Sequence, residues 1–172
     1  RLHKIPSEKV YYLDESGFNP GSAHGYGPSP VGERCYGEKI GSVHQDTFSV
    51  ISAYQNSKLI EPMIYKGTLN RTMFALYLDQ ILLPKLPSES VLVMDNLPCH
   101  KGKEIEAVAA KHSISIMYLP AYSPELNPIE KCWSHTKKEV YRIFDSLVDN
   151  FFEVLKEVLN IFTLSEDGVP TF

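Results

Sequence analysis

Two stretches, Val10-Tyr-Tyr-Leu-Asp14 and Val91-Leu-Val-Met-Asp95, decide how this chain folds. Each is a short apolar run that ends in an aspartate. The second is typical of a central strand covered on both faces, because its apolar run is unbroken. Open sheets hold ligands at the carboxyl ends of their strands. We therefore expect Asp14 and Asp95, each closing a strand, to lie together at one edge of a sheet.

The segments between these two stretches predict a hairpin and a helix. Residues 47–54 and 58–65 read as antiparallel strands joined by Gln55-Asn56-Ser57. Pro62 places the second of them at a sheet edge or at a bulge, since proline cannot donate to a central ladder. Residues 70–83 repeat apolar side chains at helical spacing, with Asn70 as the N-cap.

The remaining segments complete an α/β pattern. A short helix is expected over 103–111, a strand over 114–119 and a last amphipathic helix over 149–162. Asn127-Pro128-Ile129-Glu130 predicts the start of a long helix, with Asn as the cap and Pro at the first helical position. Its expected apolar stripe is Ile129, Trp133, Val140 and Phe144. This order predicts a single domain over 1–172 with a mixed five-stranded sheet flanked by helices. Three strands would be antiparallel and two would be added by crossover helices, which is the plan of the ribonuclease H-like fold.

The composition is that of a soluble globular domain. The 172 residues are 43% hydrophobic and 22% charged, and no apolar run is long enough to span a membrane. An odd count of three cysteines favours a reducing compartment over a disulfide framework. The chain starts without Met, so we expect it to be a piece of a longer protein. The net charge of −4 counts against nucleic-acid binding, although bound cations or a separate basic domain would offset it.

A third acid completes a candidate metal site. Glu130 follows Asp95 after 34 intervening residues, at the start of the predicted long helix. Three carboxylates from two strand ends and a helix form an oxygen-only ligand set, which suits Mg²⁺ or Mn²⁺. The reaction that such a site serves best is cleavage or transfer of a phosphodiester bond in nucleic acid. Glu130 by itself would also fit the third position of a capping box.

Three segments carry a resemblance to a known family. They are Tyr12-Leu-Asp-Glu-Ser-Gly-Phe18, Val93-Met-Asp-Asn-Leu-Pro-Cys-His100 and Leu119-Pro-Ala-Tyr-Ser-Pro-Glu-Leu-Asn-Pro-Ile-Glu-Lys-Cys-Trp133. Together they resemble the catalytic domain of DDE transposases of the mariner-like superfamily, in particular its bacterial insertion-sequence branch. The resemblance implies a metal-dependent polynucleotidyl transferase with two Mg²⁺ or Mn²⁺ ions held by Asp14, Asp95 and Glu130. It also implies an N-terminal helix-turn-helix region, which nothing in this sequence resembles.

Residues around the three acids are candidates for supporting roles. Asn96 and His100 belong to a pattern common in the resembled family, and His100 would steady Asp95 or contact the substrate backbone; a purely structural histidine is the alternative. Glu15 and Glu125 are expected to point away and to have no role. Basic residues that would hold DNA phosphates are Lys131, Lys137, Lys138 and Arg142 on the predicted long helix. Arg34 and Lys39, in the Gly- and Pro-rich loop expected over Gly21 to Gly41, would do the same. The alternative for the helix is an ordinary solvated face.

The leading hypothesis is a DNA transposase core that acts on transposon ends and target DNA as a homodimer. One alternative is a nuclease of the same fold without strand transfer, and another is a decayed or domesticated copy that only binds DNA. We expect a cytoplasmic, nucleoid-associated protein in a bacterium, or a nuclear one in a eukaryote. Because three like charges would repel one another without metal, Asp95→Asn is expected to keep the fold and to raise the melting temperature of the metal-free protein.

Overall fold

A computed structural model describes residues 5–22, 47–120, 126–144 and 150–164. The strands are β1 (Val10–Phe18), β2 (Phe48–Gln55), β3 (Lys58–Lys66), β4 (Val91–Met94) and β5 (Ser115–Tyr118). The main helices are α1 (Arg71–Leu76), α2 (Lys103–Lys111), α3 (Ile129–Ile143) and α4 (Phe151–Leu164). In the described residues, no helix is long and apolar enough to cross a membrane.

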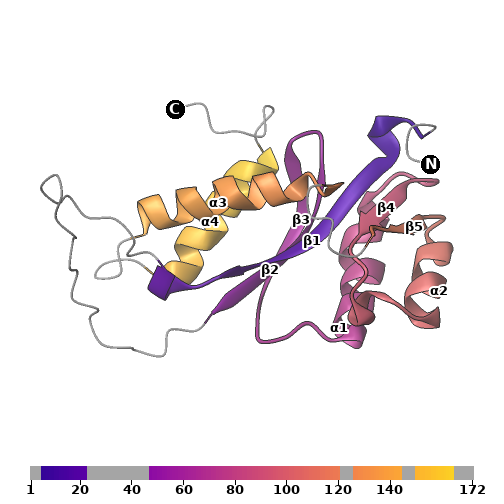
Figure 1. Cartoon of the computed structure of the whole chain (residues 1–172), viewed down its shortest axis with the longest axis horizontal. Coiled ribbons are helices and arrows are strands. Elements are labelled where there is room, and N and C mark those ends of the chain that lie inside the picture. Colours follow the sequence, from indigo (N-terminus) through magenta and orange to yellow (C-terminus); the bar gives the residue numbers. More distant parts are fainter. Residues whose placement is uncertain (1–4, 23–46, 121–125, 145–149, 165–172) are drawn as a thin grey trace, which may run out of the picture.

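One mixed sheet with the strand order β3-β2-β1-β4-β5 forms the centre of the molecule (Figure 1). β1 pairs antiparallel with β2, and β2 pairs antiparallel with β3. β4 pairs in parallel with β1 on one side and with β5 on the other. The predicted five-stranded arrangement of the ribonuclease H-like fold, with three antiparallel strands and two added by crossovers, is therefore confirmed.

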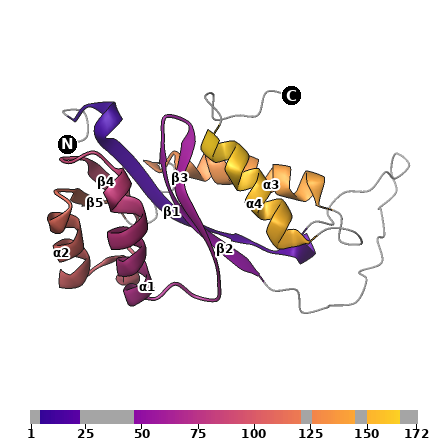
Figure 2. The same ribbon diagram turned by 180° about the vertical axis from the view of Figure 1, so that it is seen from behind.

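Helices cover the two faces of the sheet with separate apolar cores. α1, the π-helical turn that continues it (Tyr77–Leu82) and α2 pack on the face that carries Leu13, Ile51 and Leu92. α3 and α4 pack on the opposite face, against Phe18 and Val50. Figure 2 shows α4 lying beside α3 at one end of the molecule, with α1 and α2 at the other end. All four side chains of β4 are buried, as the unbroken apolar run predicts.

The hairpin of β2 and β3 agrees with its sequence signals. Asn56 and Ser57 both have positive φ, 47° and 63°, the backbone that a tight two-residue hairpin turn requires. β3 is an edge strand, and the register shifts where Ile51 pairs with Met63 but Ala53 pairs with Ile60. Pro62 thus lies at an edge and within a bulge, the two places where a strand tolerates proline.

Two helix starts differ in how they are capped. The side chain of Asn70 accepts a hydrogen bond from the Met73 amide at 2.9 Å, so the predicted N-cap is confirmed. The predicted cap at the start of α3 is wrong, because the Asn127 carboxamide oxygen is buried without a hydrogen-bond partner among the described residues. The Asn127 backbone carbonyl instead accepts from the Glu130 amide at 3.2 Å. The first turn of α3 is therefore held by backbone bonding and by burial of Ile129.

Candidate active site

Asp14 lies in the interior of a strand, which corrects the prediction that it closes one. β1 continues four residues further, to Phe18, although Ser16-Gly-Phe reads as a turn. Pairing with β2 extends from Tyr12 with Tyr54 to Phe18 with Phe48, and Phe18 is completely buried. These non-local hydrogen bonds and the burial of Phe18 outweigh the local turn preference. Asp14 therefore lies within the paired segment of β1 and β2, opposite Ser52, and is held more firmly than a residue at a strand end.

Asp95 lies beside Asp14. In the parallel pairing of β1 with β4, Val10 is opposite Val91 and Tyr12 is opposite Val93. The same register, continued by two residues, sets Asp14 opposite Asp95, directly after β4 ends at Met94. Because side chains alternate along a strand, Asp14 shares a face with Tyr12 and with the buried Phe18. That face is the one that α3 covers.

α3 supplies the third acid from this face. It runs along β1, as Figures 1 and 2 both show, and its Trp133 ring meets Phe18 edge to face with ring centroids 6.2 Å apart. The apolar stripe predicted for this helix is confirmed, since Ile129, Trp133, Val140 and Phe144 are all buried. Glu130 lies in the first turn and is exposed. The packing of α3 on the sheet thus places its first turn, and with it Glu130, near the aspartates.

The charges of the three acids affect one another. Burial, together with the nearby charges of Glu130 and Asp95, raises the pKa of Asp14 to about 7, against the opposing effect of the Glu15 backbone amide. The Trp133 indole also lowers this pKa, although its buried N–H makes no hydrogen bond of standard geometry within the described segments. When an acid resists ionisation because it is buried and two other acids lie near it, a bound cation stabilises its ionised form. The cluster therefore has the electrostatics of a cation site.

The side chains themselves are not gathered into a finished metal cluster. In the part of the chain that the structure describes, no group of three or more His, Cys, Asp or Glu side chains is arranged to hold a metal ion. The donor chemistry fits a hard divalent cation, because all three candidate ligands are carboxylates on elements that pack together. The structure thus supports the choice of residues and leaves their closure around a cation as a prediction.

His100 is buried between two carboxylates. Its Nδ1 lies 2.6 Å from Asp95 Oδ1 and its Nε2 lies 3.0 Å from Glu15 Oε1. Burial alone would lower the pKa of His100, but its hydrogen bonds to both carboxylates, together with their negative charges, raise it to about 9. Burial likewise would raise the pKa of Asp95, yet the hydrogen bond and charge of His100 bring it below its usual value. The predicted contact between His100 and Asp95 is confirmed, with an imidazolium that donates to both acids.

Glu15, for which we expected no role, makes two side-chain hydrogen bonds in the structure. It does point away from Asp14, as predicted, because neighbouring strand residues face opposite sides of the sheet. It has contacts on that side, however, since Tyr65 donates to its Oε2 at 2.5 Å and His100 to its Oε1. His100 is 85 residues away in the chain, and β3 joins β1 only through β2. The local signal was therefore no more than an acid next to a candidate ligand.

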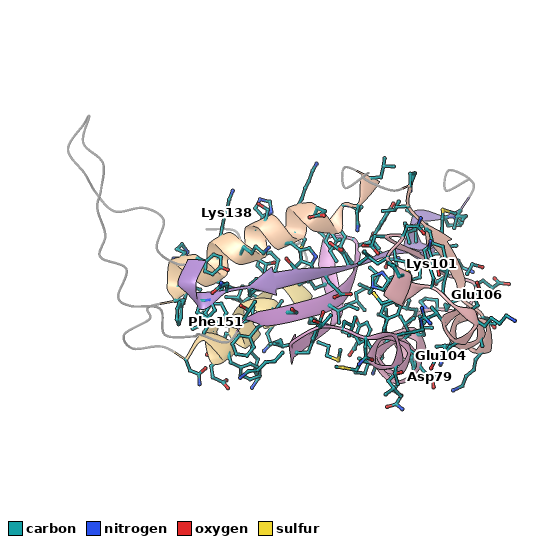
Figure 3. All side chains as sticks on the ribbon, turned by 60° about the horizontal axis from the view of Figure 1, so that its bottom comes forward. Asp79, Lys101, Glu104, Glu106, Lys138 and Phe151 are labelled. Carbon is teal, nitrogen blue, oxygen red and sulfur yellow. The ribbon has the colours of Figure 1, made fainter. Side chains whose placement is uncertain are left out.

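The other candidate residues have weaker structural support. Asn96 is exposed and makes no hydrogen bond to any described residue. Lys131 and Lys138 are exposed, and Figure 3 shows Lys138 extending from α3 away from the sheet. The Lys137 amine lies 5.7 Å from the centre of the Phe18 ring, near the end of β1. The guanidinium of Arg142 is paired with Glu139, one turn earlier on the same helix. Arg34, Lys39 and Glu125 lie outside the described residues.

Comparisons with known proteins give the family to which this chain belongs. The family described as DDE superfamily endonuclease matches residues 9–149. The Transposable element Tcb2 transposase of Caenorhabditis briggsae is 31% identical over 75 residues, which make up 44% of this chain and 28% of that protein. The chain thus spans well under two thirds of the length of this relative.

Solved structures share the fold at low sequence identity. The Mos1 transposase catalytic domain with Raltegravir and Mg has a TM-score of 0.66 at 17% identity, over 96% of this chain and 76% of that one. The Mos1 Strand Transfer Complex has a TM-score of 0.70 at 16% identity, over 96% and 51%. The catalytic core domain of BIV integrase has a TM-score of 0.56 at 14% identity, over 90% and 82%. Since the family match covers most of the sequence, the chain belongs to the DDE superfamily endonuclease family.

Proposed function

We propose that this chain is the catalytic core of a DNA transposase, which cleaves phosphodiester bonds at transposon ends and transfers the cut strand to target DNA. One observation carries the proposal: the parallel register of β1 and β4, extended two residues beyond the pair Tyr12–Val93, brings Asp14 opposite Asp95 on the side of the helix that bears Glu130. The charge coupling of these acids supports it, since Glu130 and Asp95 both raise the pKa of Asp14. Membership of the DDE superfamily endonuclease family supports it as well, as does the transposase name of the nematode relative.

Asp14, Asp95 and Glu130 would hold two Mg²⁺ or Mn²⁺ ions. Ions bound there would supply the activation of a water or a 3′-hydroxyl for attack and would neutralise charge on the leaving oxygen. Fold neighbours were solved with Mg and with Mn, which is consistent with this choice of cation. The two aspartates would form the rigid part of the site, because the pairing of β1 with β4 sets their spacing. Glu130 would complete it from the exposed first turn of α3.

The residues around the acids would orient the reaction. His100 holds Asp95 Oδ1 from the opposite face of the sheet, and the Leu97 amide donates to the same oxygen at 3.2 Å. In the described part of the chain, Asp95 Oδ2 has no hydrogen-bond partner and so remains available as a ligand. Lys131, Lys137 and Lys138 on α3 would contact backbone phosphates, which positions a strand without reading its sequence.

The proposed partners are transposon-end and target DNA, with a homodimer as the active assembly. Fold neighbours include a pre-cleavage Mos1 transpososome and a Mos1 paired-end complex, which supports an assembly of this type. The net charge of −4 favours a low intrinsic DNA affinity that bound cations increase. The bacterial insertion-sequence branch, and with it a nucleoid-associated location, stays a prediction.

A plasmid assay tests the proposal. Supercoiled DNA should be nicked in Mg²⁺ or Mn²⁺ and left intact in EDTA, while Ca²⁺ should bind but support little cleavage. Ca²⁺ prefers more ligands at longer distances, which disturbs the in-line geometry. Joining of a labelled oligonucleotide 3′-end to the plasmid would distinguish strand transfer from simple nuclease activity. Nicking that persists in EDTA, or in folded Asp14→Asn protein, would exclude the three-acid metal mechanism.

A further inference from the structure

A series of hydrogen bonds crosses the sheet on the face opposite the Asp14 side chain. It starts at the Tyr65 hydroxyl on β3, passes through Glu15 on β1 and His100, and ends at Asp95 after β4. The distances along it are 2.5, 3.0 and 2.6 Å. The His100 side chain is only 3% exposed, so both of its donors are shielded from water and committed to these carboxylates. Short hydrogen bonds between charged groups in a shielded site are strong and directional.

These hydrogen bonds constrain Oδ1 of Asp95 and leave Oδ2 unconstrained. Oδ1 accepts from the His100 ring and from the Leu97 amide. Two donors on one oxygen fix the rotation of the carboxylate, so Oδ2 is presented in a single direction. The segment that bears Asp95 needs such a constraint, because the next three residues, 96–98, are all exposed.

Glu15 ties this constraint to the strand that carries the other aspartate. Asp14 and Glu15 are consecutive in β1 and face opposite sides of the sheet. A movement of Asp95 relative to β1 would break the contact between His100 and Glu15. The spacing of Asp14 and Asp95 therefore depends on β1, because His100 joins Asp95 to Glu15 on the face of the sheet opposite Asp14.

We propose that Glu15 is a positioning residue, which acts through His100 to set the orientation of the Asp95 carboxylate for a divalent cation. Tyr65 is its support, because its hydroxyl occupies the second oxygen of Glu15 and keeps the first directed at His100. The inference rests on the proposed function, since it concerns the same metal site. It adds two residues, Glu15 and Tyr65, to the set on which that site depends.

Other contacts, which do not involve Glu15, hold the segment around His100 in place. The effect of Glu15 on Asp95 can therefore be distinguished from an effect on folding. The His100 ring packs on Phe74 with centroids 4.4 Å apart, and the Tyr118 hydroxyl donates to the His100 carbonyl at 2.9 Å. Arg71 donates to the Pro98 carbonyl at 3.1 Å. None of these contacts involves the Glu15 side chain. A change at Glu15 is thus expected to loosen Asp95 while the loop after β4 keeps its place.

The test is a Mn²⁺ titration followed by electron paramagnetic resonance, with plasmid nicking measured on the same samples. Glu15→Ala should weaken Mn²⁺ binding about 10- to 100-fold, the usual cost of losing a residue that orients a metal ligand. Glu15→Gln should recover part of the loss, because its carbonyl oxygen can still accept from His100. Tyr65→Phe should give a smaller loss than Glu15→Ala. Glu104→Gln, an exposed acid on α2, is the matched control, and urea unfolding confirms that each variant is folded.

The outcomes separate this inference from the proposed function. Weaker Mn²⁺ binding in Glu15→Ala with partial recovery in Glu15→Gln supports the positioning role. Wild-type binding and nicking in Glu15→Ala, while Asp95→Asn loses both, would overturn the positioning role and leave the transposase proposal intact. Wild-type Mn²⁺ binding in Asp95→Asn would overturn the metal site itself, and the positioning role with it. If Glu15→Ala does not fold, Tyr65→Phe decides by the same readings.

Discussion

Asp14→Asn should stabilise the metal-free protein, and the gain should increase with pH. Burial and the neighbouring acids raise the pKa of Asp14 from 3.8 to about 7. An acid with a higher pKa in the folded than in the unfolded state binds its proton more tightly when folded. Its contribution to stability is therefore complete below pH 4 and is lost as the pH rises through about 7. Asparagine has no proton to lose, so the variant escapes this penalty.

The size of the effect follows from the shift. About three pKa units correspond to a penalty of about 4 kcal/mol, of which about 3 kcal/mol develops between pH 5 and pH 8. That is a large share of the 5–15 kcal/mol typical of a whole domain. Asp14→Asn should therefore gain about 3 kcal/mol more stability over wild type at pH 8 than at pH 5.

Urea unfolding in EDTA, followed by circular dichroism at several pH values, measures this difference. Glu104→Gln, on the exposed face of α2, is the control for removal of a carboxylate without burial. Addition of Mg²⁺ at pH 8 should stabilise wild type and leave Asp14→Asn unchanged, because the cation needs the ionised acid. An advantage of Asp14→Asn that is the same at pH 5 and pH 8 would refute the assignment of a strained, ionised Asp14.

Three further changes give distinct expectations. Asp95→Asn should destabilise the metal-free protein and abolish nicking, because it removes the negative charge that pairs with His100, although the carboxamide oxygen can still accept the hydrogen bond. The sequence alone predicts a higher melting temperature for this variant, and a urea midpoint above wild type would bear that prediction out. Glu130→Gln should remain folded, because no side-chain cap bond from the residues that the structure describes holds the start of α3. It should lose cleavage, because it removes the charge of a proposed metal ligand. Full nicking activity would leave a site of two aspartates. Asn70→Ala should lower the free energy of unfolding by about 1 kcal/mol through loss of the α1 cap, and an unchanged urea midpoint would contradict the bonding seen at Met73.

Local patterns were sufficient to predict most of the helices and strands and to nominate three acids as candidate ligands. The unbroken apolar run of Val91–Met94 predicted a strand buried on both faces, and β4 is such a strand. The spacing of Ile129, Trp133 and Val140 predicted which face of α3 is buried. Both patterns work because side-chain period and burial are short-range properties of a strand or a helix. The same applies to the hairpin turn at Asn56 and Ser57, where two residues set the geometry.

Only the tertiary structure decided where the strands end and which side chains meet. The turn-like residues after Asp14 are strand because β2 pairs with them and Phe18 is buried, and neither fact is encoded within β1 itself. Glu15 contacts His100 and Tyr65, which lie 85 and 50 residues away in the chain, and the role that we propose for it depends on these contacts. The sequence by itself nominated three acids as cation ligands, and that assignment stays a prediction. The sheet determined how they are aimed, because orientation depends on contacts that exist only once β1, β3 and β4 are assembled.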